Sequence, residues 1–130
     1  MPKSTWYIPA ILWAILIIIL SGFPGNKVPE LPIWQFDKFI HTAMYAVFSI
    51  LLLLPYLQLK KQPLTYFIII LIGVFLGGIM EILQNNIFIN RSGNWYDFFA
   101  NCLGTVLGIV LFPFVIKLLP INKLIYKNHF

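Results

Sequence analysis

The chain has 130 residues, of which 60% are hydrophobic, 17% are aromatic and only 10% are charged. Soluble domains carry roughly 25% charged residues, so this composition argues against a water-soluble domain. The formal net charge is +5 at pH 7. Basic flanks that face anionic lipid account for that charge, so we expect no nucleic-acid partner.

Four stretches of the sequence carry no charged residue, and each is 19 to 23 residues long. They are residues 4–26, 39–59, 62–80 and 98–116. A bilayer core of about 30 Å needs roughly 20 apolar residues, so each stretch can cross it. Because no remaining stretch could fold as a separate soluble domain, we predict an all-α fold: residues 1–130 form one polytopic membrane domain, a bundle of four transmembrane helices.

The four helices are predicted from the apolar stretches and the residues that break them. A loop rich in proline and glycine, residues 22–36, follows the first helix. The short turn that contains Lys60 and Lys61 makes the second and third helices an antiparallel hairpin. The fourth helix ends before Pro120. The predicted helices span about residues 5–21, 37–57, 64–85 and 97–119.

Lysine and arginine residues are divided unequally between the two sides of this bundle. Six lie on the side of both termini: Lys3, Lys60, Lys61, Lys117, Lys123 and Lys127. Three lie on the other side: Lys27, Lys38 and Arg91. Because cytoplasmic loops carry the excess of basic residues, we expect both termini in the cytoplasm.

Polar residues gather at the opposite, outer end of the predicted helices. Asp37, His41 and Tyr45 are spaced by four and form one stripe on the second helix. On the fourth helix, Asp97 and Asn101 lead into Gly104 and Gly108, and on the third, Gly73 and Gly77 lead into Glu81, with Gln84 one turn on. Small residues at this spacing favour helix packing, so we expect these three faces to turn inward.

Glu81 is the strongest single indication of a site, because it follows 19 uncharged residues and lies about one turn below the predicted interface. An ionisable residue at membrane depth is a functional-site hypothesis by default. Asp37 and Asp97 have a second interpretation, since a carboxylate at a helix start caps the helix and complements its dipole. Both interpretations stay open for these two residues.

His41 is the only histidine at membrane depth, because His129 lies in the basic tail. It is a candidate general acid–base, and the simpler alternative is a structural histidine bonded to Asp37 or Glu81. One histidine with three carboxylates is a weak metal-ligand pattern. We therefore predict neither a metal nor a cofactor.

Three blocks of spaced residues resemble the VanZ-like family of small bacterial integral membrane proteins. The first is Asp37-Lys38-Phe39-Ile40-His41 followed by Tyr45, similar to the family's D-K-x-x-H-x-x-x-Y signature, and the second is Glu81-Ile82-Leu83-Gln84, similar to its E-x-x-Q. The third is Arg91 followed by Asp97, Asn101, Gly104 and Gly108, similar to R and then D-x-x-x-N-x-x-G-x-x-x-G. The chain departs from the family at Ile89-Asn90, where many relatives have Pro-Gly.

The resemblance implies a multi-pass protein of the bacterial cytoplasmic (inner) membrane. The founding member of the family is associated with low-level resistance to the glycopeptide teicoplanin, so the implied role is in the cell envelope. The expected partners are membrane lipid and a lipid-linked cell-wall precursor or glycopeptide, with a homo-oligomer as a further option. The residues expected to bind such a ligand are Asp37, Lys38, His41, Glu81, Gln84, Arg91, Asp97 and Asn101.

Three functions compete on these residues. The first is the binding site just described, in which Arg91 and Lys38 contact phosphate. The second is an intramembrane enzyme acting on a phosphate- or ester-containing lipid, with His41, Glu81, Asp37, Asp97 and Arg91 as catalytic candidates. The third is a structural membrane subunit whose charges only hold the bundle together. A transporter is the least attractive reading, since four helices leave little room for a pathway.

Overall fold

The computed structural model describes residues 4–24, 34–57, 63–88 and 93–120. These residues form helices and connecting turns, without a strand among them. The predicted all-α, four-helix architecture is therefore confirmed. The elements are η1 (Ser4–Tyr7), α1 (Ile8–Ser21), α2 (Trp34–Leu53), η3 (Leu54–Tyr56), α3 (Pro63–Asn86) and α4 (Trp95–Leu118).

Four helical segments are long and apolar enough to cross a membrane, as expected of a multi-pass membrane protein. They span Ser4–Ser21, Phe36–Tyr56, Pro63–Asn86 and Trp95–Leu118. Large apolar side chains stay exposed on every one of them, including Leu12, Phe39, Phe75 and Phe114. Hydrocarbon rather than water suits such a surface.

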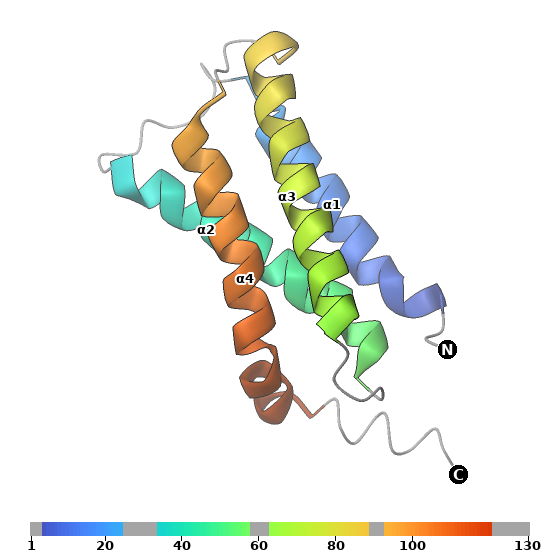
Figure 1. Ribbon diagram of the computed structural model, residues 1–130. Helices are drawn as coiled ribbons and strands as arrows, with labels where there is room; N and C mark the ends of the chain where they lie inside the picture. Colours follow the sequence, from blue (N-terminus) through green and yellow to red (C-terminus); the bar gives the residue numbers. More distant parts are fainter. Residues whose placement is uncertain (1–3, 25–33, 58–62, 89–92, 121–130) are drawn as a thin grey trace.

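The first helix begins and the last helix ends at the same end of the bundle (Figure 1). The opposite end, where α4 begins and α3 ends, also lies toward the start of α2, and we call it the polar end. In this view α2 crosses the bundle obliquely, whereas α1, α3 and α4 run more nearly along its length. The main neighbour of α2 is α4.

Glycines on α4 allow the backbones of α2 and α4 to come close. A Cβ atom at Gly104 would collide with the carbonyl oxygen of Thr42, and one at Gly108 would collide with Ser49 Oγ and the carbonyl oxygen of Ala46. On α3, a Cβ at Gly73 would collide with the side chain of α4 residue Thr105. Small residues that let helices approach in this way are typical of membrane bundles.

α1 packs more lightly, and only Ala10 and Ile17 are buried along it. Trp13 Nε1 on α1 donates a hydrogen bond of 2.9 Å to the carbonyl oxygen of Met44 on α2. The buried core around Ala10 and Ile17 is completed by Tyr45, Phe48 and Met80 from α2 and α3. The exposed side of α1 is apolar and suits contact with lipid.

Two helices begin earlier than the sequence predicted. α2 begins at Trp34 rather than 37, and α4 begins at Trp95 rather than 97. The N-cap of α4 is Asn94, whose side chain accepts a hydrogen bond from the backbone N–H of Tyr96 at 2.9 Å. The two acidic residues taken as helix starts, Asp37 and Asp97, lie inside the first turns, where a carboxylate still complements the helix dipole.

Several residues of the topology argument lie outside the described residues. Among them is the predicted turn between the second and third helices. The lysines concerned are Lys3, Lys27, Lys60, Lys61, Lys123 and Lys127. The orientation of the bundle in the membrane therefore stays a prediction.

Candidate functional site

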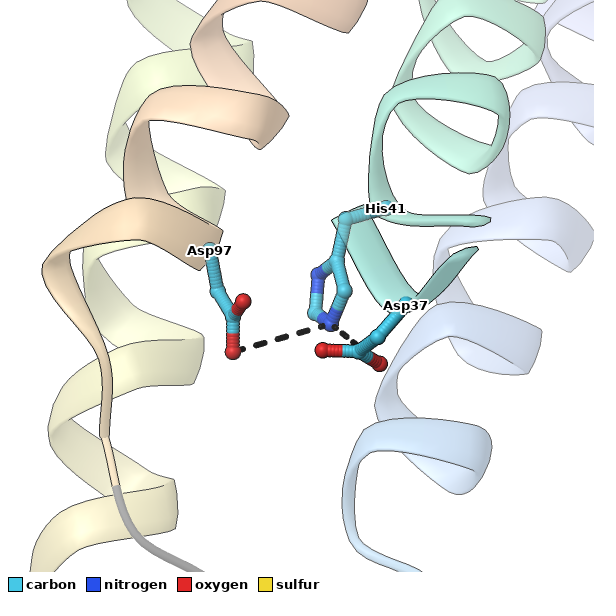
Figure 2. A group of neighbouring side chains, drawn as sticks. All are labelled: Asp37, His41 and Asp97. Carbon is cyan, nitrogen blue, oxygen red and sulfur yellow. Dashed lines mark ion pairs between the residues drawn. The ribbon is translucent and has the colours of Figure 1, made fainter. Parts of the chain in front are cut away.

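Five polar side chains from α2 and α4 meet at the polar end, and we call them the charged cluster. The cluster consists of Asp37, Lys38 and His41 from α2 and of Asp97 and Asn101 from α4. Figure 2 shows Asp37 and His41 projecting from α2 toward Asp97 on α4. Two residues of the predicted stripe on the second helix thus face the predicted polar face of the fourth.

Lys38 bridges the two carboxylates of the cluster. Its Nζ lies 3.0 Å from Asp37 Oδ2 and also contacts Asp97 Oδ1. The side chains of Lys38 and Asp97 are only 17% and 12% exposed, so this ion pair is largely shielded from solvent. Each carboxylate uses one oxygen for Lys38 and turns its other oxygen toward His41.

His41 is held by Asn101. The two side chains are joined by a hydrogen bond of 2.9 Å between His41 Nδ1 and Asn101 Oδ1. An amide oxygen only accepts hydrogen bonds, so Nδ1 donates and carries a proton. The sequence had suggested Asp37 or Glu81 as the hydrogen-bond partner of His41, whereas the structure places Asn101, which is 1% exposed, in that role.

The other ring nitrogen of His41 faces both carboxylates. His41 Nε2 lies 3.8 Å from Asp37 Oδ1 and 3.9 Å from Asp97 Oδ2, beyond the range of a hydrogen bond. In a neutral imidazole protonated at Nδ1, Nε2 carries a lone pair, and it would then point at two acceptor oxygens. A second proton, a cation or a donor group from a ligand would make this arrangement favourable.

The charged cluster is reached from the side of Asp37. The Asp37 side chain is 47% exposed, whereas that of His41 is 15% exposed. Aromatic side chains at the starts of α2 and α4 are also exposed, namely Phe36, Phe39, Trp95, Tyr96 and Phe99. Tryptophan and tyrosine are enriched where a membrane protein meets the head groups, which suits this end of the bundle for the membrane interface.

Glu81 lies beside the charged cluster rather than within it. Its Oε2 accepts a hydrogen bond of 2.7 Å from the backbone N–H of Asn94, which ties the end of α3 to the cap of α4. Lys38, His41 and Asp97 all interact electrostatically with the Glu81 carboxylate. The sequence predicted that Glu81 belongs to a site or to an ion-pair network. In the structure its carboxylate accepts a hydrogen bond from the backbone.

Two buried oxygen atoms near this region have no hydrogen-bond partner within the described parts of the chain. They are Glu81 Oε1 and Tyr45 Oη. Tyr45 is 2% exposed, and its ring and Asn101 both lie within 4 Å of the position that a Cβ at Gly77 would take. Buried polar groups are almost always satisfied, so each of these atoms is suited to a water molecule or a ligand group.

A pocket of about 390 Å³ opens next to Glu81, between the end of α3 and the start of α4. Gly93 lines it, and a Cβ there would come within 2.6 Å of the carbonyl oxygen of Glu81. The lining residues are Gly78, Glu81, Ile82, Asn85, Asn86, Gly93, Asn94, Trp95 and Phe98. Glu81 therefore lines this pocket and also lies beside the charged cluster.

Of the predicted site residues that the structure describes, Gln84 and Glu81 do not join the cluster. Gln84 is 3% exposed and donates from Nε2 to the carbonyl oxygen of Ser21 at 3.2 Å, so it holds α3 against the end of α1. Arg91 lies outside the described residues.

Two residues at this end were missed by the sequence reasoning. Asn94 caps α4 and binds Glu81, and Gly93 allows the backbones to approach there. Asparagine before a helical run is a signal for an N-cap and could have indicated the role of Asn94.

Comparison of the chain with known protein families, curated proteins and solved structures finds no match. The relation to the VanZ-like family remains a prediction that rests on the spaced polar residues.

Proposed function

We propose that this chain is a multi-pass protein of the bacterial cytoplasmic membrane whose charged cluster binds the polar head group of a lipid or of a lipid-linked cell-envelope precursor. The observation that carries the proposal is the geometry of His41. Its Nε2 faces two carboxylate oxygens at 3.8 and 3.9 Å, and one of those carboxylates, Asp37, is 47% exposed. Polar groups arranged toward an accessible point are suited to a ligand.

The position of the cluster supports a ligand from the membrane. The exposed aromatic residues Trp95 and Tyr96 begin α4, which also carries Asp97. Side chains of this kind prefer the depth of the lipid head groups. A head group could therefore reach the cluster without leaving the bilayer surface, on the outer face if both termini are cytoplasmic.

The two buried oxygens without a hydrogen-bond partner among the described residues, Glu81 Oε1 and Tyr45 Oη, also support a ligand near the cluster. Glu81 Oε1 accepts and Tyr45 Oη donates, so a ligand with both hydroxyl and amide groups would satisfy them. Lipid-linked sugars and glycopeptides carry such groups. The teicoplanin link implied by the family resemblance is consistent with a ligand of that chemistry.

The proposal is tested with the purified full-length protein in nanodiscs. Head-group binding is measured for short-chain lipids with phosphate, glycerol and choline head groups and for a glycopeptide. We expect saturable binding of at least one of these by the wild type and at least about tenfold weaker binding by His41→Gln. Lys117→Gln, in the last turn of α4, is the matched control and should bind like the wild type.

Two results would contradict the proposal. One is the absence of saturable binding to any of these probes, and the other is equal binding by the wild type and His41→Gln. If His41→Gln and the similar variant Glu81→Gln lower the amount of folded protein without changing binding per molecule, the third function, a structural subunit, is favoured.

A second function, an intramembrane enzyme, is favoured by the orientation of His41. A histidine whose Nδ1 is held by a hydrogen bond, with Nε2 directed to the reacting group, is a common general acid–base arrangement. Membrane lipids extracted from cells that express the wild type or His41→Gln distinguish it from binding alone. A lipid species that changes chemically only with the wild type would support catalysis, and identical lipid profiles would exclude it.

A further inference from the structure

We propose that Asp37, His41 and Asp97 together bind one divalent transition-metal ion, of the Zn²⁺ or Mn²⁺ class, at the polar end. His41 Nε2 and one oxygen of each carboxylate lie within 4.8 Å of one another. Figure 2 shows these groups directed toward a common point between α2 and α4. The inference departs from the sequence-based expectation of no metal, because the sequence did not show that both aspartates face His41.

The distances between the donor atoms suit a shared ion. Zn²⁺ lies about 2.0–2.2 Å from histidine nitrogen and carboxylate oxygen, so two ligands of a tetrahedral site are about 3.4 Å apart. The separations from Nε2, 3.8 and 3.9 Å, are a few tenths of an ångström longer, which small side-chain rotations would close, and they are too long for direct hydrogen bonds. An ion between these atoms would satisfy all three at once.

Each proposed ligand side chain is oriented by a second hydrogen bond or ion pair, as in known metal sites. Metal-binding histidines usually donate their second N–H to a carbonyl or carboxylate, and His41 Nδ1 pairs with Asn101 Oδ1 at 2.9 Å. The carboxylate oxygens turned away from His41 are held by Lys38. Asn101 thus leaves Nε2 as the lone-pair nitrogen that a metal requires, and Lys38 orients both carboxylates.

Charge and donor type indicate the class of ion. With a neutral imidazole, the two carboxylates and the one ammonium of the cluster sum to a single negative charge, so a cation is attracted. Imidazole nitrogen suits Zn²⁺ and carboxylate oxygen suits Mn²⁺, whereas Ca²⁺ takes six to eight oxygen ligands and Mg²⁺ prefers oxygen as well. A mixed nitrogen and oxygen set therefore favours the transition metals.

The exposed side of Asp37 leaves room for a further ligand on the ion. Three protein ligands leave at least one position open on Zn²⁺. A bound divalent ion would turn the cluster from net negative to net positive and allow it to hold an anionic phosphate. In this respect the inference rests on the proposed function, since both place ligand binding at the charged cluster.

The test uses the full-length protein, purified in detergent with an affinity tag that lacks histidine. The protein is treated with EDTA, dialysed, and then titrated with ZnCl₂ or MnCl₂, and bound metal is counted by mass spectrometry. We expect one ion per wild-type chain and at least about tenfold lower affinity in His41→Gln and Asp97→Asn. Asp37→Asn changes a half-exposed side chain, so it should fold normally and also lose affinity.

Glu81→Gln is the matched control, because it removes one carboxylate near the cluster but none of the three proposed ligands. It should keep one ion per chain. Co²⁺ gives a second readout, since its visible spectrum reports its ligands and should change in His41→Gln. The metal proposal is overturned if the wild type binds no more Zn²⁺ or Mn²⁺ than His41→Gln, or if Glu81→Gln loses as much metal as Asp97→Asn.

Short-chain phosphatidic acid separates the failure of this proposal from that of head-group binding. Binding of the lipid only in the presence of Zn²⁺ or Mn²⁺ would support both. Equal binding by metal-free protein, together with no more metal on the wild type than on His41→Gln, would overturn the metal site and leave the proposed function standing. One bound ion per chain without binding of any head group would support the metal site and overturn the proposed function.

Discussion

The single ammonium group of Lys38 forms ion pairs with two carboxylates. It contacts Asp37 on its own helix and Asp97 on α4, so it joins the two helices at the polar end. Breaking a shielded ion pair by removing one partner is costly, because the remaining charge is left without compensation. Lys38 is therefore an orienting residue of the cluster as well as a proposed contact for a ligand.

We expect Lys38→Met to lower the free energy of unfolding by about 2 kcal/mol, less than the roughly 3–5 kcal/mol typical of fully buried pairs, because Asp37 is half-exposed. Removing Asp97 as well, in Lys38→Met/Asp97→Asn, should recover part of that loss. The measurement is reversible unfolding in mixed micelles, analysed as a double-mutant cycle. Additive effects of the two substitutions would contradict a direct interaction.

At the level of residues, spacing predicted which side chains share a face, but not which atoms meet. Asp37 and His41 are one turn apart, so their common stripe follows from helix geometry. The partner of His41 depends on how α2 is rotated against α4, and that rotation is set by contacts such as Gly104 with Thr42. Sequence spacing within one helix contains no information about this rotation.

Among the helices, the contact between α2 and α4 is the closest backbone approach that we describe. It depends on the absence of side chains at Gly104 and Gly108, whose Cβ positions are taken by atoms of α2. Gly78 on α3 offers a contrast. A Cβ there would meet Phe98 Cε2 at 3.7 Å, which is an ordinary contact.

We expect Gly104→Ala and Gly108→Ala each to destabilise the protein by about 1–3 kcal/mol, because α4 must move away from α2. Gly78→Ala should be neutral or stabilising by up to about 1 kcal/mol, since alanine favours helix and its Cβ fits. Unfolding in mixed micelles compares the three variants. Equal effects at Gly78 and Gly104 would show that helix propensity, not the close approach, determines the result.

The ends of the helices were harder to predict than their existence. α3 begins and ends within one residue of its predicted bounds of 64–85, because a proline begins it and polar residues close it. α2 and α4 were taken to start at acidic residues, which are common in first turns as well as at caps. Asn94 is the cap of α4, and a carboxylate two or three residues later gives the same local signal.

For the whole molecule, an even number of membrane-spanning helices places the first and last described residues, Ser4 and Pro120, on one side. The excess of lysine and arginine on that side predicts that it is cytoplasmic. Reporter fusions at the two ends of the chain should therefore both be active in the cytoplasm. A reporter active outside the membrane at either end would contradict the predicted orientation.

The four-helix architecture could be predicted because it follows from a local property, the length of each charge-free stretch. The charged cluster could be predicted only in part. It is formed by the second and fourth helices, and loop lengths do not determine that α2 takes α4 as its main neighbour. From the sequence, Glu81 was as good a candidate for the cluster as Asp37 or Asp97. In the structure its side chain is instead hydrogen-bonded to the backbone of Asn94.

The pairing of α2 with α4 also has a consequence for how the protein is made. During synthesis, α2 leaves the ribosome before α3, and α4 follows both, so Asp37, Lys38 and His41 enter the membrane before Asp97 and Asn101 exist to meet them. Until then Lys38 lacks Asp97 as its second carboxylate partner and is paired with Asp37 on its own helix. We therefore expect a stage of synthesis in which these polar residues contact lipid head groups or the insertion machinery. This stage ends when α4 inserts and packs against α2.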